Sequence, residues 1–241
     1  MTAQPNFAAT PARCSAAAIE GQPMLTFDLV GPFHQQRRHV EKTIAQRFAD
    51  VYGASIKHFM PLQLCVSLNQ EIVATVGIRR AQQSPLFLEQ YFDAPMESFA
   101  SKVLGRNIAR DEIVEIGNLA STWRGASQWL FAVLTLLLCE QQQPWVAFTA
   151  TPEVQKLLRR LDITPHALTS ADADRLGDNK STWGNYYAQK PLVMITHAPT
   201  AKRNLLAHPL MATCMAQLEP FIETLSTQWQ TNCEGEHDRA Y

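Results

Sequence analysis

Short apolar runs alternate with stretches of helical periodicity along this chain. Runs that are rich in β-branched and aromatic side chains and bounded by turn residues are typical of strands. They predict strands at Met24–Val30, Leu62–Leu68, Glu71–Arg79, Asp111–Ser121, Trp145–Thr151 and Leu192–His197. Apolar residues spaced by about 3.6 positions, or an apolar stretch too long for a strand, predict helices at Phe33–Tyr52, Pro95–Leu104, Gly125–Gln141 and Pro152–Leu161.

Turn residues mark the ends of several of these elements. The pair Asn69-Gln70 lies between two strand patterns and predicts an antiparallel hairpin, although Asn-Gln is a weaker turn pair than Asn-Gly. Gly53 and Gly105 follow helical patterns and are expected C-terminal stops. Together the elements alternate as in a mixed α/β protein, in which one sheet with helices on both faces buries the apolar positions.

The two ends of the chain differ from the middle. Residues 1–22 lack an apolar pattern and predict a flexible arm, so the domain is expected to span residues 23–199. Residues 200–241 predict an amphipathic helical extension that starts at Pro209 and is kinked or restarted by Pro220. Its apolar stripe consists of Leu206, Leu210, Cys214, Leu218, Ile222 and Leu225. The stripe could contact a membrane surface, but without a basic face it favours packing on its own domain or on the partner in a homodimer.

Composition narrows the possible classes. The 241 residues hold 21 Lys and Arg against 22 Asp and Glu, a balance that argues against a nucleic-acid partner. The five cysteines are scattered, as expected for reduced thiols in a cytoplasmic protein, and the histidines show no pairing that predicts a metal site. The longest apolar run, Trp129–Cys139, is too short to span a bilayer, and no signal peptide is recognised.

Glu115 and Gly117 are unusual within their predicted strand. A carboxylate between Val114 and Ile116 is costly to bury without a partner, and burial would raise its pKa toward the range of a general base. A glycine inside a strand suggests a bulge or a close approach by a ligand or by another backbone. The alternative is a solvated Glu115 on an edge strand.

The residues that follow this strand are candidates for anion binding. Trp123, Arg124, Gly125, Ala126 and Ser127 lead directly into an apolar helix. Free N–H groups at a helix start, with an arginine beside them, suit a phosphate. The alternative is an ordinary turn at a helix entry.

Two further groups of residues are candidates for substrate contact. Glu89 and Tyr91 stand among apolar residues and could line a substrate pocket or end a strand. Trp183, Tyr186 and Tyr187 form an aromatic cluster before the last strand. A tyrosine can protonate a leaving thiolate, whereas aromatic clusters often only bury area, and the sequence does not choose between Tyr186 and Tyr187.

Several segments resemble the bacterial family named thermostable hemolysin. They are LFLEQYFDAP at Leu86–Pro95, EIVEIGNLAS at Glu112–Ser121, WVAFTAT at Trp145–Thr151 and WGNYYAQKPLVM at Trp183–Met194. The turn before the apolar helix is similar to the phosphate-binding turn of GNAT acyltransferases, with Gly125 as its central glycine. The layout is also similar to that of acyl-homoserine-lactone autoinducer synthases, although Asn118 stands where their Glu-x-x-Arg pattern has arginine.

This resemblance implies a GNAT-like fold with a mixed, mostly antiparallel sheet that splays between Glu112–Ser121 and Trp145–Thr151. The implied function is transfer of an acyl group from acyl-CoA or an acyl carrier protein to a small amine, with no tightly bound cofactor. Asn118, Leu119 and Ala120 are then expected to bind the donor, with a backbone N–H near Leu119 facing the oxyanion. A membrane-active hemolysin and a noncatalytic ligand-binding protein are the alternatives.

Overall fold

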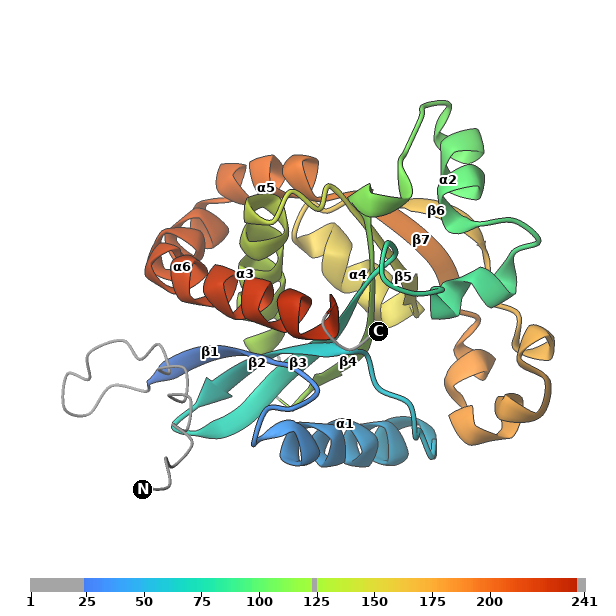
Figure 1. The fold of residues 1–241 in the computed structure, drawn as a ribbon, viewed down its shortest axis with the longest axis horizontal. Coiled ribbons are helices and arrows are strands. Elements are labelled where there is room, and N and C mark those ends of the chain that lie inside the picture. The colour runs from blue at the N-terminus through green and yellow to red at the C-terminus, as the bar shows by residue number, and fades with distance from the viewer. Residues whose placement is uncertain (1–23, 123–124, 238–241) are drawn as a thin grey trace, which may run out of the picture.

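The computed structural model describes residues 24–122 and 125–237 of the chain, so the predicted N-terminal arm lies outside the described residues. A seven-stranded sheet with the order β1-β2-β3-β4-β5-β7-β6 forms its centre (Figure 1). The strands are β1 (Leu25–Val30), β2 (Leu62–Leu68), β3 (Glu71–Arg80), β4 (Ile113–Ser121), β5 (Trp145–Ala150), β6 (His166–Ser170) and β7 (Leu192–His197). The sequence did not predict β6, an edge strand whose mostly exposed side chains carry no apolar pattern.

Neighbouring strands pair antiparallel throughout the sheet, except that β4 and β5 are parallel. The mixed, mostly antiparallel sheet that was predicted is therefore confirmed. The hairpin between β2 and β3 is also confirmed: Asn69 and Gln70 have φ angles of 49° and 72°, as the two central residues of a type I′ turn require.

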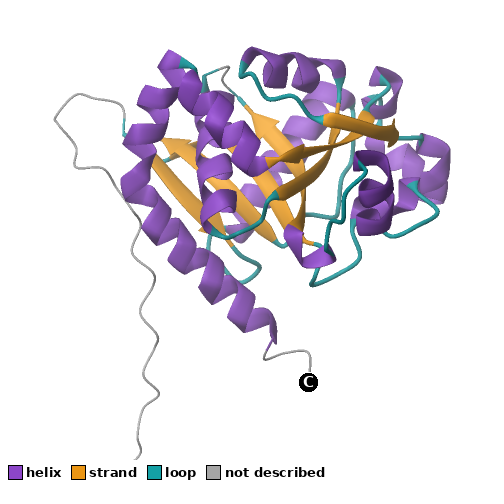
Figure 2. Cartoon of the chain, turned by 90° about the horizontal axis from the view of Figure 1, so that it is seen from above, coloured by secondary structure: helices purple, strands orange, loops and turns teal. Residues whose placement is uncertain are grey.

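Helices cover both faces of the sheet. Helix α1 (Arg37–Tyr52) lies on one face, and α3 (Ala126–Glu140), α5 (Ala198–Ala207) and α6 (Pro209–His237) lie on the other (Figure 1). The remaining helical segments are α2 (Met96–Leu104), α4 (Pro152–Arg160) and the 3₁₀ segments η1 (Phe87–Tyr91), η2 (Arg110–Glu112), η3 (Ala173–Trp183) and η4 (Tyr186–Gln189). Seen from above, helices surround the twisted strands (Figure 2).

Helix α3 is apolar around most of its circumference because other elements enclose it. It packs on β2 and β3 on one side and on α5 and α6 on the other. Leu130, Val133 and Leu137 are completely buried. This confirms the buried helix expected from its continuous apolar run. No helix in the described part of the chain has the length and hydropathy needed to cross a membrane.

The C-terminal residues pack against their own chain. The buried face of α6 carries Met211, Met215, Leu218, Phe221, Leu225 and Trp229, which join the core around α3. The predicted stripe is partly wrong, because Leu206 and Leu210 are 48% and 74% exposed. The helix also continues through Pro220 and does not restart there. A homodimer through this helix stays a prediction.

Candidate active site at the opening between β4 and β5

Strands β4 and β5 separate partway along their length. Their pairing runs from Ile113↔Trp145 to Ile116↔Phe148, after which β4 continues to Ser121. Beyond the last pair, Asn118 adopts a left-handed conformation with a φ of 50°. Asparagine tolerates this conformation better than most residues, and the resulting bulge redirects the strand. The splay expected between these two strands is therefore present.

Met60 fills the space left by two facing glycines. Gly77 of β3 and Gly117 of β4 are register partners. A Cβ atom on Gly77 would lie 2.6 Å from Cβ of Met60, and one on Gly117 would lie 2.8 Å from Cε of Met60. The Met60 N–H also donates to Oδ1 of Asn118 at 2.8 Å. The group that comes close to Gly117 is thus the Met60 side chain, from the loop before β2, and not another backbone as the glycine had suggested.

The Glu115 carboxylate is buried, with 1% of the residue exposed. Its oxygens accept hydrogen bonds from the N–H groups of Phe87 and Leu88, each at 2.9 Å, and Nη1 of Arg79 lies 3.7 Å from Oε2. Burial raises the pKa of Glu115 to about 7, although Arg79 and the two N–H groups oppose this rise. Each carboxylate oxygen keeps a second lone pair, so the group can still accept a proton near neutral pH.

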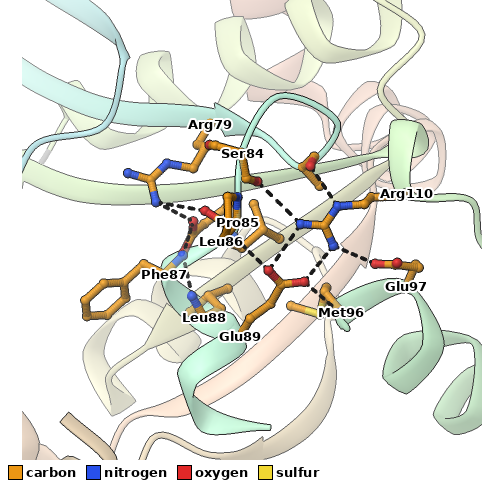
Figure 3. Close-up of polar contacts among 12 residues, drawn as sticks. Arg79, Ser84, Pro85, Leu86, Phe87, Leu88, Glu89, Met96, Glu97 and Arg110 are labelled. Atoms are coloured by element: carbon orange, nitrogen blue, oxygen red, sulfur yellow. Dashed lines mark hydrogen bonds and ion pairs between the residues drawn. The ribbon is translucent and has the colours of Figure 1, made fainter. Parts of the chain in front are cut away.

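A second arginine holds the segment that binds Glu115. Figure 3 shows Arg79 on one side of residues 84–89 and Arg110 on the other. Arg110 donates to the carbonyl oxygen of Ala81 at 2.8 Å, to Glu89 at 2.6 and 3.1 Å, and to Glu97 at 2.8 Å. These bonds tie η1 to η2 and α2, and so position the two N–H groups that face Glu115.

Glu89 serves this arrangement. Its carboxylate also accepts hydrogen bonds from the N–H groups of Leu86 and Met96. Burial would raise the pKa of Glu89, but the bonds from Arg110 and the two N–H groups outweigh it and lower the pKa to about 2. Glu89 was predicted to contact substrate; the structure places its carboxylate in this cluster, apart from the cavity described next.

A cavity of about 390 Å³ lies on the α1 side of the opening, and we name it the polar cavity. Its walls come from α1, the loop before β2, β3, η1, the separated ends of β4 and β5, α4, η3 and η4. The predicted site residues that line it are Glu115, Asn118, Leu119, Trp183, Tyr186 and Tyr187. The structure therefore brings together residues that are far apart in the sequence.

The two candidate tyrosines have different partners in the polar cavity. The Tyr186 hydroxyl is 2.8 Å from Oγ1 of Thr149, whereas the Tyr187 hydroxyl shares a short hydrogen bond with that of Tyr91. Burial raises the pKa of all three tyrosines, that of Tyr187 to about 12, so each hydroxyl keeps its proton at neutral pH. Tyr91 itself is buried behind Tyr187, and it is not among the described residues that line the cavity.

A narrow cavity of about 60 Å³ lies across the sheet, between the opening and helices α3, α4 and α5. We name it the apolar cavity, since its lining is mostly aliphatic and aromatic. The residues that line both cavities are Ile116, Gly117, Leu119, Thr149 and Val154. The opening between β4 and β5 is thus where the two cavities meet.

The predicted donor-binding residues are divided by the fold. Asn118 and Leu119 lie at the opening, but Ala120 pairs with Thr75 inside the sheet and is buried. Ala126 begins α3 directly after Gly125. Ser127 follows and is buried. Trp123 and Arg124 lie outside the described residues, so the phosphate turn stays a prediction.

Other lining residues were not predicted. Arg79 is the register partner of Glu115 on β3, Lys57 and His58 come from the loop before β2, and Thr149 comes from β5. The sequence feature that could have pointed to Arg79 was its place at the end of a predicted strand, but charged residues are common at strand ends. Pairing it with Glu115 needed the register of β3 on β4, which the pattern does not contain.

The segment that carries Trp183 is tied to the end of α1. The Ser55 N–H donates to the carbonyl oxygen of Thr182 at 2.7 Å, and the Asn185 N–H donates to that of Tyr52 at 2.7 Å. Between them, Gly184 has φ 51° and ψ −127°. These bonds hold the aromatic residues of η3 and η4 over the polar cavity.

Comparison with known proteins identifies structural relatives. FeeM, an N-acyl amino acid synthase from uncultured soil microbes, has a TM-score of 0.54 and 13% identity, covering 78% of this chain and 98% of FeeM. BjaI, a CoA-dependent acyl-homoserine lactone synthase solved with SAM and isopentyl-CoA, has a TM-score of 0.52 and 10% identity, covering 78% and 90%. The AHL synthase LasI has a TM-score of 0.51 and 9% identity, covering 73% and 91%.

These likenesses show a common fold. A search of curated proteins finds no match. Residues 30–201, well over half of the chain, match the family described as thermostable hemolysin. The matched residues extend from the end of β1 into α5 and include both cavities. The chain belongs to the thermostable hemolysin family.

Proposed function

We propose that this chain transfers an acyl group from a thioester to an amine at the opening between β4 and β5. The observation that carries the proposal is the meeting of a polar and an apolar cavity at this opening, with Glu115 on its polar side. The reactions named for FeeM and BjaI, N-acyl amino acid synthesis and CoA-dependent acyl-homoserine lactone synthesis, support this kind of chemistry.

In the proposed reaction the thioester carbonyl lies in the opening and the acyl chain enters the apolar cavity. The acceptor amine lies in the polar cavity and gives a proton to Glu115, directly or through a water. The amine nitrogen forms a bond to the carbonyl carbon, and the bond from that carbon to sulfur then breaks. A backbone N–H near Leu119 stabilises the negative oxygen of the intermediate.

The donor is an acyl-CoA or an acyl carrier protein thioester. Its phosphate is expected at the start of α3, where Ala126 and Ser127 begin the helix and N–H groups are not used within it. The predicted turn residues before them complete this site in the proposal.

Tyr186 is the tyrosine better placed to return a proton to sulfur. Its partner Thr149 lines both cavities. Thr149 follows Ala147, the register partner of Glu115, by two residues, or about 7 Å along the strand. Tyr187 instead points to Tyr91.

Tyr186→Phe is therefore expected to lower kcat about 10²-fold or more, the usual contribution of a general acid. Tyr187→Phe is the matched control: it breaks one buried hydrogen bond, at a cost of about 1–3 kcal/mol in stability, and leaves most of the turnover. Single-turnover thiol release measures both variants. Equal losses in the two would remove Tyr186 from this role.

The apolar cavity is expected to set the acyl chain length. Thr135 lines it from α3, and its hydroxyl donates to the Phe131 carbonyl within the helix. Thr135→Leu fills the cavity, so each methylene that no longer fits should lower kcat/KM about fourfold. Thr135→Ser enlarges the cavity and should favour longer chains. The preferred acyl-chain length is measured across an acyl-CoA series. If it does not become shorter in Thr135→Leu and longer in Thr135→Ser, the acyl group binds outside the apolar cavity.

The proposed function itself is tested with purified protein, a series of acyl-CoAs and acyl carrier protein thioesters, and pools of amines. Release of free thiol that depends on the amine supports acyl transfer. Thioester binding without release would favour a noncatalytic binding protein. If no thioester binds and the protein releases dye from liposomes, the membrane-active alternative replaces the proposal.

A further inference from the structure

The polar cavity carries more positive than negative charge. Among its lining residues that the structure describes, Arg79, Lys57 and His58 are basic, and Glu115 is the one acidic side chain. The Glu115 carboxylate already accepts two backbone hydrogen bonds. Such a cavity favours a ligand that carries a negative charge and disfavours one with an additional positive charge.

Arg79 has donors to spare. Its Nη1 makes only long contacts, at 3.4 Å to the carbonyl oxygen of Pro85 and at 3.7 Å to Oε2 of Glu115. Within residues 24–122 and 125–237, no hydrogen-bond acceptor is paired with its Nε or Nη2. Its side chain is 24% exposed and lines the polar cavity. A guanidinium has five N–H donors arranged to bind a carboxylate through two parallel bonds.

Arg110, in contrast to Arg79, has its guanidinium nitrogens hydrogen-bonded within the protein. Its Nε and both Nη atoms bind the carboxylates of Glu89 and Glu97 and the carbonyl oxygens of Ala81 and Ser84 (Figure 3). It lies on the side of residues 84–89 opposite Arg79. The two arginines therefore differ in role. Arg110 holds residues 84–89 in place, whereas Arg79 faces the cavity with N–H groups that can bind a ligand.

Arg79 and Glu115 can reach one small molecule together. They are direct register partners on β3 and β4, so their side chains leave the same face about 5 Å apart. An α-amino acid has its amine and its carboxylate on one carbon, a spacing that matches two such neighbours. The rest of the cavity wall is rich in aromatic rings, which include Phe48, Tyr52, Phe87, Trp183, Tyr186 and Tyr187.

The geometry points to an α-amino acid with an uncharged, apolar side chain as the acceptor: Arg79 binds its carboxylate, Glu115 faces its amine, and the aromatic wall holds its side chain. This inference rests on the proposed function for the chemistry, but the carboxylate site also stands as a binding site without turnover. Lys57, which is exposed, adds to the attraction of the anion at the cavity mouth.

The test compares amino acids with the amines that lack only the carboxylate. L-Phenylalanine is paired with 2-phenylethylamine, and L-leucine with 3-methylbutylamine. We expect kcat/KM of thiol release to favour the amino acid in each pair by about 10- to 100-fold, the range of charge-assisted hydrogen bonds. Arg79→Gln should remove this preference through KM of the amino acid, and Arg79→Lys should restore part of it.

The ratio within a pair separates recognition from general damage, since a misfolded or poorly positioned Glu115 would slow both members alike. Arg38→Gln, on the exposed face of α1, is the matched control and should leave the ratio unchanged. A wild-type ratio near one, or an Arg79→Gln variant that keeps the wild-type ratio, would overturn the inference.

Calorimetry without a donor keeps the two proposals apart. If no thioester is turned over, the proposed function fails, but tighter binding of phenylalanine than of 2-phenylethylamine that is lost in Arg79→Gln still supports the carboxylate site. If thiol release is efficient with both members of every pair, acyl transfer stands and the amino-acid acceptor is wrong. Equal binding of both members without turnover overturns both proposals.

Discussion

Glu115→Gln is expected to lower kcat for acyl transfer by about 10²- to 10⁴-fold, because the variant keeps the size of the side chain and loses its basicity. The amide oxygen of the variant can still accept one of the two N–H groups, that of Phe87 or that of Leu88. The amide NH₂ group then faces the other N–H, which loses its acceptor. A stability loss of about 1–3 kcal/mol should accompany the change. Single-turnover thiol release and urea unfolding measure the two effects separately.

The pH dependence identifies the group that is responsible. With the pKa of Glu115 raised to about 7 by burial, kcat/KM should rise with pH through about 7 as the carboxylate loses its proton. This limb should stay in place when acceptors with different amine pKa values are compared, and it should vanish in Glu115→Gln. Glu71→Gln, on the exposed start of β3, is the control. Full turnover in folded Glu115→Gln would exclude it as the base.

The raised pKa of Glu115 also makes the stability of the fold depend on pH. The folded chain holds the Glu115 proton more tightly than the unfolded chain, in which the pKa is near 4.5. The contribution of Glu115 is therefore fully present below pH 4.5 and declines as the pH rises to about 7. Unfolding curves of the wild type and of Glu115→Gln across this range should differ by that slope.

Gly184→Ala is expected to cost at least about 3 kcal/mol of unfolding free energy, more than a typical substitution. Its φ of 51° and ψ of −127° lie in a region that is nearly restricted to glycine. An added Cβ atom would also lie 2.1 Å from the carbonyl oxygen of Tyr52, which accepts the Asn185 N–H. Relief of this clash must move η4 away from α1 and so disturb the polar cavity.

Gly177→Ala is the matched control for that variant. Gly177 has φ 56° and ψ −133°, close to the angles of Gly184, but an added Cβ atom would meet nothing within 4 Å. Only the backbone strain remains, about 1–3 kcal/mol. Urea unfolding of both variants isolates the contribution of the contact with α1. Equal losses in the two would mean that the segment around Gly184 is not held against Tyr52.

Most strands and helices could be predicted from the sequence because they depend on the pattern of apolar and polar residues over a few neighbouring positions. Alternating or continuous apolar runs placed the strands, and the continuous apolar character of α3 predicted a helix enclosed by other layers. Glu115 and Gly117 were identifiable because a carboxylate and a glycine are rare inside an apolar strand, whatever surrounds them. The tail was harder: the predicted stripe began with Leu206 and Leu210, but the residues buried there are their neighbours Leu205 and Met211.

The site depended on contacts between distant segments. Local pattern did not distinguish Glu89, which Arg110 uses to hold η1, from a residue that faces substrate. It also did not show that Tyr186 meets Thr149, or that Arg79 is the register partner of Glu115. The sequence alone determined most of the strands and helices, although not β6, since these depend on neighbours a few positions apart. Strand register and layer packing decided which side chains share a cavity, because those contacts join residues that are far apart in the chain.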